Sequence, residues 1–253
     1  MTGGAGRLQD RVILVSGAGR GIGRATCLRL ASEGARLICA DIDAEGAATT
    51  AALIGGTAIS LRCDVTDATS AQAAIAEGVA KFGSLYGLIN NAAAPSIDAT
   101  VVDLARSDWD REIAVSLTGA FLMSKFAVPH MASANAGSIV HVASQFARVA
   151  VAGSAAYCAA KAGLVNLAKV MALDHAPQHI RVNTLSPGAV GTERLAAHHG
   201  SIAEAQRKLA PKHPIGRIAR PEEIAAAAAF LMSDDSSFMT GADLLVDGGY
   251  AAQ

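Results

Sequence analysis

Short runs of apolar and β-branched residues alternate along the chain with longer segments whose apolar positions recur at helical spacing. This alternation is typical of parallel βαβ units joined by right-handed crossovers. The short runs predict seven strands, at 12–16, 36–40, 58–63, 86–90, 138–143, 180–185 and 244–246. The intervening helical segments include 22–33, 67–82, 107–131 and 155–175. We expect an α/β fold with a doubly wound parallel sheet of order 3-2-1-4-5-6-7 and helices on both faces.

A Pro-Gly break at residues 187–188 opens a region that differs from the rest of the chain. Up to Pro221 it contains three prolines, two adjacent histidines and no clear strand. We interpret about 188–214 as a mobile substrate lid. Neither internal repeats nor a low-complexity linker divide the chain, so residues 1–253 are expected to form a single dinucleotide-binding catalytic domain.

Composition narrows the list of partners. The 253 residues carry 21 basic and 22 acidic side chains, which are scattered and give a formal charge of -1. This balance predicts no nucleic-acid partner. The Gly-rich start, 1–10, lacks an apolar signal core, and we expect no later stretch to reach the ~20 apolar residues of a membrane span. We therefore expect no membrane association and a cytoplasmic protein.

Cysteine and histidine spacing indicates neither disulfides nor a metal site. The four cysteines form no CxxC pair, and three lie in apolar runs, where a thiol behaves as a small hydrophobic group. His198 and His199 are adjacent but belong to no HExxH or Cys/His cluster. We expect reduced cysteines and no metal requirement, which chelator-sensitive activity would contradict.

A glycine-rich turn, SGAGRGIG at 16–23, follows the first predicted strand and opens a helix. Glycines allow positive φ and a close approach of the backbone to a pyrophosphate, whose charge then lies at the helix N-terminus. A glycine-rich string alone is weak evidence, but the strand-turn-helix context makes it specific. It predicts a Rossmann-type dinucleotide site.

The acidic residue that ends the second strand, Asp41, lies at the spacing expected for a carboxylate that binds the adenosine ribose. A 2′-phosphate would meet this charge, and two like charges ~4 Å apart repel by about 4 kcal/mol at an effective dielectric of 20. NAD is therefore favoured over NADP. Two alternatives remain: Arg20 could pair with a 2′-phosphate, and Asp41 could instead cap the next helix.

Two further strand ends lie at the same edge of the sheet. Asp64 either accepts a hydrogen bond from the adenine amino group or caps the following helix. The amides of Asn90 and Asn91 can hold strand edges together and contact the cofactor. We favour the structural role for these amides.

Tyr157 and Lys161 are four residues apart in a predicted helix, so both side chains lie on one face. A phenol is a poor base at neutral pH, but a nearby ammonium and a positive nicotinamide ring stabilise its phenolate. Ser144, at the end of the fifth strand, can hold the substrate oxygen. YxxxK alone is common by chance. Together, the three residues indicate proton transfer coupled to hydride transfer.

These motifs resemble, in order and spacing, those of the short-chain dehydrogenase/reductase family over nearly the whole chain. The resemblance also covers SPG at 186–188, GR at 216–217, PEEIA at 221–225 and DGG at 247–249. The last three motifs resemble the carboxyl-terminal segment that builds the last helix, the last strand and the tetramer contacts in this family. It implies that Tyr157 is the acid/base, that Lys161 holds the nicotinamide ribose and lowers the tyrosine pKa, and that Ser144 orients the carbonyl. The expected cofactor-binding residues are Gly17, Gly19, Arg20, Gly21, Ile22, Gly23, Asp41, Asp64, Val65, Asn91, Ala92, Tyr157, Lys161, Pro187, Gly188, Val190 and Thr192.

The chain departs from the family pattern at Ser116, where the family usually has a catalytic asparagine. That asparagine helps hold a water that links the lysine to solvent. Serine is shorter but can still donate and accept hydrogen bonds. We expect activity to be kept through a rearranged water chain, with Ser116 counted among the catalytic residues. Two smaller departures are Ser16 for threonine and Ala93 for glycine.

The predicted function is NAD-dependent interconversion of a secondary alcohol and a ketone. We also expect the protein to form a homotetramer. Alternatives are an NADPH-dependent 3-oxoacyl reductase and, from another class, a dinucleotide-binding sensor or scaffold with little catalysis. Charged residues of the loops, Arg148, Arg194, His198 and His199, either favour an acidic or polyhydroxylated substrate or are simply solvated. The expected substrate-binding residues are Ala94, Ser144, Gln145, Phe146, Tyr157 and Gly188, with Pro95 and Ser96 beside them.

Overall fold

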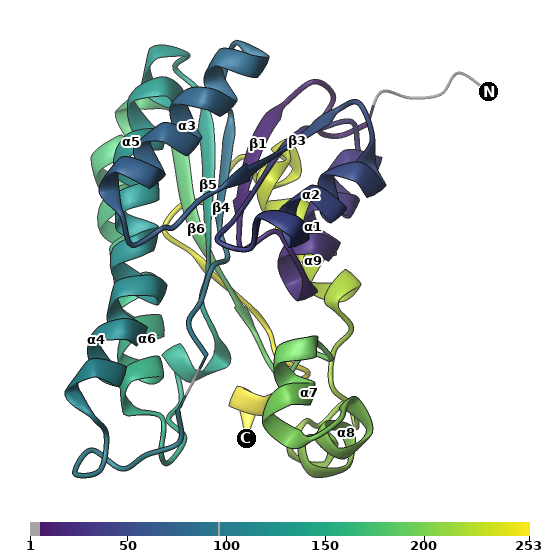
Figure 1. Cartoon of the computed structure of the whole chain (residues 1–253), viewed down its shortest axis with the longest axis vertical. Coiled ribbons are helices and arrows are strands. Elements are labelled where there is room, and N and C mark those ends of the chain that lie inside the picture. Colours follow the sequence, from purple (N-terminus) through teal and green to yellow (C-terminus); the bar gives the residue numbers. More distant parts are fainter. Residues whose placement is uncertain (1–5, 96) are drawn as a thin grey trace.

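A computed structural model describes residues 6–95 and 97–253 and shows one parallel seven-stranded sheet (Figure 1). The order β3-β2-β1-β4-β5-β6-β7 confirms the predicted topology. The strands are β1 (Val12–Ser16), β2 (Arg36–Asp41), β3 (Ala58–Arg62), β4 (Gly87–Asn90), β5 (Gly137–Val142), β6 (Ile180–Pro187) and β7 (Asp243–Val246). The order reverses at β1, which pairs with both β2 and β4, so the carboxyl ends of these strands border a crevice suited to a ligand.

Helices cover both faces of the sheet (Figure 1). One layer contains α1 (Gly21–Ser32), α2 (Ala44–Ile54) and α9 (Pro221–Met232). The other contains α3 (Ala68–Phe82), α4 (Arg106–Ile113), α5 (Gly119–Ser133) and α6 (Ala155–His175). Two short helices, α7 (Glu193–His199) and α8 (Ile202–Leu209), lie at the bottom of Figure 1, beyond the carboxyl end of β6. The predicted lid segment is therefore helical, and its mobility stays a prediction.

The core consists of two apolar layers separated by the sheet. In β1, Val12 and Leu14 pack with the layer of α3, α5 and α6, whereas Ile13 and Val15 pack with the layer of α1 and α9. Side chains of a strand point to alternate faces, so a central strand covered on both sides is apolar throughout. This explains why the strands are continuous apolar runs, and it gives the carboxyl edge of the sheet a rigid support.

The predicted helix 107–131 is in fact interrupted. A π-helical turn, η1 (Ala114–Thr118), separates α4 from α5. Such a turn contains an extra residue relative to the α-helix, and π-turns are frequent at functional sites. Its central residue is Ser116, which is 1% exposed. The hydrophobic periodicity alone did not reveal this break.

Two helical stretches, Arg106–Ser133 and Ala155–Gln178, are long and apolar enough to cross a membrane by length and composition. The expectation that no stretch reaches this length was wrong. The core explains their apolarity, because Met123, Met131 and Leu164 of these stretches are fully buried in it. Core helices of soluble proteins pass the same test, so this is weak evidence for a membrane span.

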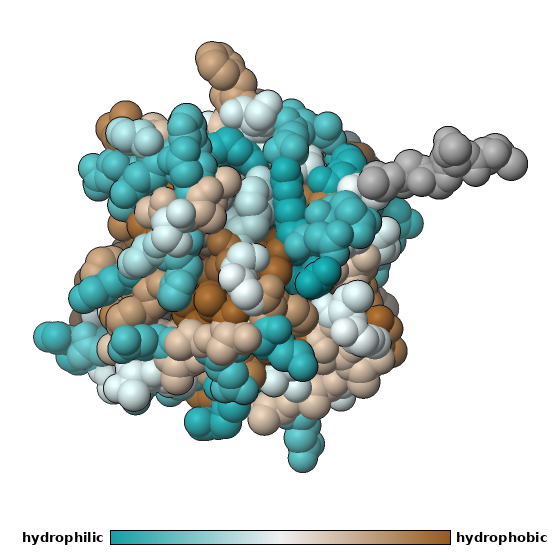
Figure 2. Space-filling view, turned by 90° about the horizontal axis from the view of Figure 1, so that it is seen from above, coloured by the Kyte–Doolittle hydropathy of each residue, from teal (hydrophilic) through white to brown (hydrophobic). Residues whose placement is uncertain are grey.

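The end of the molecule opposite α7 and α8 is seen from above in Figure 2. Polar side chains cover much of this face, and apolar side chains are visible toward its middle.

Within the described residues the cysteines are free: Cys27, Cys39 and Cys63 are buried, and Cys158 is partly exposed. The prediction of unpaired cysteines is confirmed.

Candidate active site

The glycine-rich turn leaves no room for side chains. Gly17 and Gly21 have positive φ angles of 66° and 54°. A Cβ on Gly17 would stand 2.9 Å from the Cα of Ala92, and a Cβ on Gly23 would overlap the carbonyl oxygen of Gly17. Only glycine permits this turn, which runs from the end of β1 into the first turn of α1.

The start of α1 suits an anionic ligand. Arg20 precedes the helix without a side-chain cap, and the first turn contains no acidic residue. Backbone N–H groups at such a helix start favour phosphate. Thr192 closes the opposite side, with its methyl 3.2 Å from the position of a Cβ on Gly21. The residues present therefore fit the pyrophosphate of a nicotinamide dinucleotide.

Asp41 lies beside this turn at the end of β2. Its Oδ2 accepts a hydrogen bond from the Gly19 N–H at 2.8 Å, and its Oδ1 accepts one from the Asp43 N–H at 2.9 Å. The cap of α2 is Asp43, which accepts from the Gly46 N–H. Helix capping is thus not the role of Asp41, and its carboxylate borders the crevice where we expect the adenosine ribose. Arg20 is exposed on the same turn.

Asp64 does not cap the next helix either. Its Oδ1 accepts hydrogen bonds from the backbone N–H and the hydroxyl of Thr66, and these bonds lower the pKa of the carboxyl. The cap of α3 is Asp67. Val65 is buried and packs against Gly119 of α5. The adenine-binding roles of Asp64 and Val65 stay predictions.

The two asparagines at the end of β4 hold the sheet together, as we favoured. The buried Asn90 amide contacts His141 Nδ1 at 3.0 Å and donates to Ser124 Oγ at 3.2 Å. The Asn91 amide donates to the carbonyls of Ser16 and Gly17 at 3.2 and 2.9 Å. Asn91 therefore fixes the start of the glycine-rich turn, and Ala92 is its direct neighbour.

Tyr157, Lys161 and Ser144 come together at the carboxyl end of β5. Lys161 is 2% exposed, its Nζ donates to the Val142 carbonyl at 2.7 Å, and it lies 5.7 Å from the centre of the Tyr157 ring. The Ser144 hydroxyl is hydrogen-bonded to Tyr157. Helix α6 begins at Ala155 and ends at His175, as predicted, and it presents Tyr157 and Lys161 on one face. The predicted triad is therefore assembled.

Burial dominates the protonation of this group. It lowers the pKa of Lys161 to about 7, helped by the positive charge of Arg194 and opposed by the carboxylate of Glu112. Burial also raises the pKa of Tyr157, against the Arg194 charge and the Ser144 hydrogen bond. The protein alone thus does not show the lowered tyrosine pKa that the resemblance implied, because desolvation of the phenol outweighs the nearby positive charge.

Ser116 contacts a residue that sequence reasoning missed. Its hydroxyl donates to Glu112 Oε1 at 2.6 Å and accepts from the Ala94 N–H at 3.4 Å. Glu112 is only 4% exposed although it lies in a polar sequence, and both α4 and η1 pack against α6. The spacing of four residues between Glu112 and Ser116 was the one signal in the sequence.

Several of the predicted substrate residues lie beside Ser144 and Ser116. Ala94 and Gln145 are buried, and Gln145 Oε1 lacks a hydrogen-bond partner within the described part of the chain. A Cβ on Gly188 would stand 3.0 Å from that oxygen. Phe146 packs edge-on against Tyr250, with ring centres 5.9 Å apart. Ser96 lies outside the described residues.

The charged loop residues divide into two groups. Arg148 is bound to Asp243, with 2.6 Å between its Nε and the buried carboxylate, so its guanidinium is tied to the start of β7. His198 pairs with Asp98 at 3.4 Å and stacks edge-on against His199. Arg194 lies 5.8 Å from the centre of the Tyr157 ring. Of the four charged residues, Arg194 is therefore the one that lies against the catalytic tyrosine.

Two predicted cofactor-binding residues lie at the end of β6 and just beyond it. Val190 is buried and forms a β-bridge with Ala219, and Pro187 is the last residue of β6.

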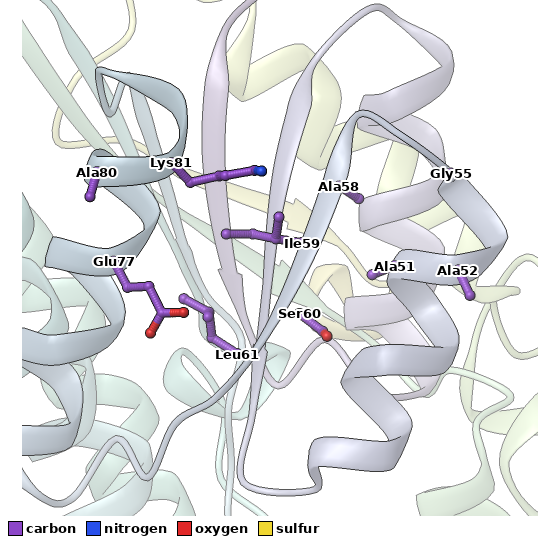
Figure 3. A pocket seen from close by; sticks show the side chains of 10 residues that line it. All are labelled: Ala51, Ala52, Gly55, Ala58, Ile59, Ser60, Leu61, Glu77, Ala80 and Lys81. Carbon is purple, nitrogen blue, oxygen red and sulfur yellow. The ribbon is translucent and has the colours of Figure 1, made fainter.

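An open pocket of about 790 Å³ lies elsewhere, at the β3 edge of the sheet between α2 and α3 (Figure 3). Figure 3 shows Glu77 and Lys81 of α3 on one side and Ala51 of α2 on the other. None of the residues that line it belongs to the predicted triad or to the glycine-rich turn. This pocket is therefore not the candidate active site.

Comparisons with known proteins agree with this geometry. A family profile described as enoyl-(acyl carrier protein) reductase matches residues 17–251. The chain is 44% identical to D-threitol dehydrogenase of Mycolicibacterium smegmatis over 96% of this chain and 94% of that protein. It is also 44% identical to cis-4-hydroxycyclohexanecarboxylate dehydrogenase of Sinomonas cyclohexanicum, over 96% and 97%. The crystal structure of a short-chain type dehydrogenase/reductase from Mycobacterium marinum superposes with a TM-score of 0.91 at 32% identity, over 97% of each chain.

These matches extend over nearly the full chain, and the fold agrees with them. The chain belongs to the short-chain dehydrogenase/reductase family, whose members use a nicotinamide dinucleotide.

Proposed function

We propose that this protein is an NAD-dependent oxidoreductase that interconverts a secondary alcohol and a ketone. The observation that carries the proposal is the assembly of Tyr157, Lys161 and Ser144 at the carboxyl end of β5, at the same edge of the sheet as the glycine-rich turn. The named relatives oxidise threitol and a hydroxycyclohexane carboxylate, which supports an alcohol substrate.

The bound dinucleotide would supply hydride transfer at its nicotinamide ring. Residues 17–23 would hold its pyrophosphate, and Asp41 its adenosine ribose. In oxidation, Tyr157 accepts the hydroxyl proton of the substrate, while Ser144 donates a hydrogen bond to the same oxygen. Lys161, in its protonated form, would place a positive charge close to the phenolate. In reduction, the proton returns from Tyr157 to the carbonyl oxygen.

The preference for NAD rests on Asp41, whose carboxylate would repel a 2′-phosphate. The competing proposal is an NADPH-dependent 3-oxoacyl reductase, which the exposed Arg20 would favour. Turnover with NAD and with NADP, compared at equal concentrations, separates the two. An NADP preference would overturn the assignment.

The substrate is proposed to be a polyhydroxylated alcohol. Gln145 Oε1 is a buried acceptor without a partner among the described residues, and a buried polar group without a partner is costly. A second hydroxyl of the substrate would satisfy it. Oxidation of 2,3-butanediol should therefore exceed that of 2-butanol in kcat/KM, and Gln145→Leu should remove the difference. Equal rates for both alcohols would contradict this assignment.

A hydroxy acid is the second candidate, because Arg194 lies 5.8 Å from the centre of the Tyr157 ring. A carboxylate bound by Arg194 would suit a substrate of the kind named for the relative cis-4-hydroxycyclohexanecarboxylate dehydrogenase. If 4-hydroxycyclohexanecarboxylate is oxidised faster than cyclohexanol, and Arg194→Ala raises KM for the acid alone, this candidate replaces the polyol.

The assembly is proposed to be a homotetramer in the cytoplasm. Large apolar side chains are exposed on the outer helix layer, namely Phe121 of α5 and Val170 and Leu173 of α6. Burial of such a surface in an interface stabilises an oligomer. Light scattering should give four times the chain mass, and a monomer would contradict the proposal.

The proposal from another class, a dinucleotide sensor with little catalysis, is tested together with the enzyme. Measurable turnover with any secondary alcohol that disappears in Tyr157→Phe eliminates the sensor. Tight NAD binding without turnover across the panel would instead support it.

A further inference from the structure

Glu112 is a buried carboxylate for which the proposed reaction has no role so far. It is 4% exposed, and its Oε1 accepts a hydrogen bond from the Ser116 hydroxyl at 2.6 Å. A buried negative charge is costly unless positive charge or strong hydrogen bonds compensate it. One serine hydroxyl is a small compensation, so the positive charge nearby becomes important.

The titrating group on which the Glu112 charge acts is Lys161. Helix α4, which carries Glu112, and the π-turn that carries Ser116 both pack against α6. The Lys161 ammonium donates to the Val142 carbonyl and is 2% exposed. The Glu112 charge raises the pKa of Lys161 and that of Tyr157, so it acts on both members of the pair. Ser116 thus holds a carboxylate at a position from which it influences the whole proton-transfer group.

We propose that Glu112 is a positioning residue of the reaction: its buried charge, held against the site by Ser116, sets the pH range in which Tyr157 and Lys161 exchange protons with the substrate. The inference rests on the proposed function of these two residues. It also assigns a purpose to serine at position 116, where a hydroxyl reaches both the Ala94 N–H and the carboxylate.

The sign of the effect follows from coupled titration. The working form of the pair has lost one of its two protons, so activity in oxidation rises at one apparent pKa and falls at a second. A negative charge nearby raises both values. Removal of the charge therefore moves the whole profile to lower pH, whereas a purely structural defect lowers the rate without moving it.

Other groups face the pair and must stay unchanged in the test. Arg194 acts on it from α7, Cys158 from α6 itself, and His141 from β5 is influenced by Lys161. Burial and the Lys161 charge lower the pKa of His141 to about 4, so that residue stays neutral over the range of the assay.

The experiment compares Glu112→Gln with Glu112→Asp, which keeps the charge, and with Glu77→Gln, which removes the same charge beside the pocket at the β3 edge. The pH dependence of kcat for alcohol oxidation is measured for each. Glu112→Gln should move both limbs down by about 1 pH unit, the order expected for one neighbouring charge. The other two variants should keep the wild-type position.

A second readout does not depend on turnover. The pKa of Lys161 is followed by NMR in the protein without cofactor, with ¹³C-labelled lysine and with Lys161→Met to assign the signal. Glu112→Gln should lower it below the wild-type value. An unchanged lysine pKa, or an unmoved profile with lower rates, would overturn the inference. Failure of the proposed function would look different, since wild-type protein would then show no Tyr157-dependent turnover while the lysine titration still reports on Glu112.

Discussion

Replacement of Asp41 by asparagine should shift the cofactor preference from NAD toward NADP. The carboxylate borders the crevice at the end of β2, with Oδ2 bonded to the Gly19 N–H at 2.8 Å. Against one phosphate charge ~4 Å away, repulsion is about 1 kcal/mol in water and about 4 kcal/mol at an effective dielectric of 20. Asp41 is partly exposed, so we take a value between these limits, about 2.5 kcal/mol.

This free energy corresponds to a change of roughly 70-fold in the ratio of kcat/KM for NADP to that for NAD. Steady-state rates with each cofactor, at fixed saturating alcohol, measure the ratio. The matched control is Asp43→Asn, because Asp43 is an exposed acid two residues away that caps α2. If Asp41→Asn leaves the ratio within about threefold of wild type, or if Asp43→Asn changes it equally, the assignment of Asp41 is refuted.

Three other changes test the site. Gly23→Ala would place a Cβ against the Gly17 carbonyl, so NAD affinity measured by fluorescence titration should fall at least about tenfold, and unchanged affinity would contradict the dinucleotide turn. Ser116→Asn should lower kcat several-fold, because a larger amide must fit where the hydroxyl of Ser116, a residue only 1% exposed, is hydrogen-bonded to Glu112. A strong gain in kcat would instead show that serine compromises the proton relay. The titration of Lys161 alone should raise the free energy of unfolding by about 1.4 kcal/mol per pH unit between pH 7.5 and 9.5. In this range the lysine of the unfolded chain still binds a proton, whereas the buried lysine of the folded protein has lost its proton above about pH 7. Urea unfolding of Lys161→Met should lack this slope, and equal slopes would contradict the buried lysine.

Local periodicity was sufficient to predict the sheet order and the bounds of α6. The central strands, such as β1, β4 and β5, are buried on both faces, so their apolar runs are unambiguous. Tyr157 and Lys161 share one face of a helix for purely local reasons. The interruption between α4 and α5 was not predictable in this way, because a π-turn adds one residue without breaking the apolar pattern.

The residues that were missed are those whose pairing or burial depends on segments distant in sequence. Arg148 was expected either to favour an acidic or polyhydroxylated substrate or to be solvated, but its partner Asp243 lies 95 positions away and its pairing appears only when β7 joins β6. Glu112 lies among charged residues typical of a solvated helix face, and only packing against α6 buries it. Long-range packing, which no local pattern encodes, decides both cases.

The most direct test of the central claim is NAD reduction by a panel of secondary alcohols with wild type and Tyr157→Phe. General acid-base catalysis contributes about 10²- to 10⁴-fold, so the variant should lose at least about 100-fold in kcat while it still binds NAD. Turnover that survives the loss of the phenol hydroxyl would show that the proton moves by another route and would contradict the account.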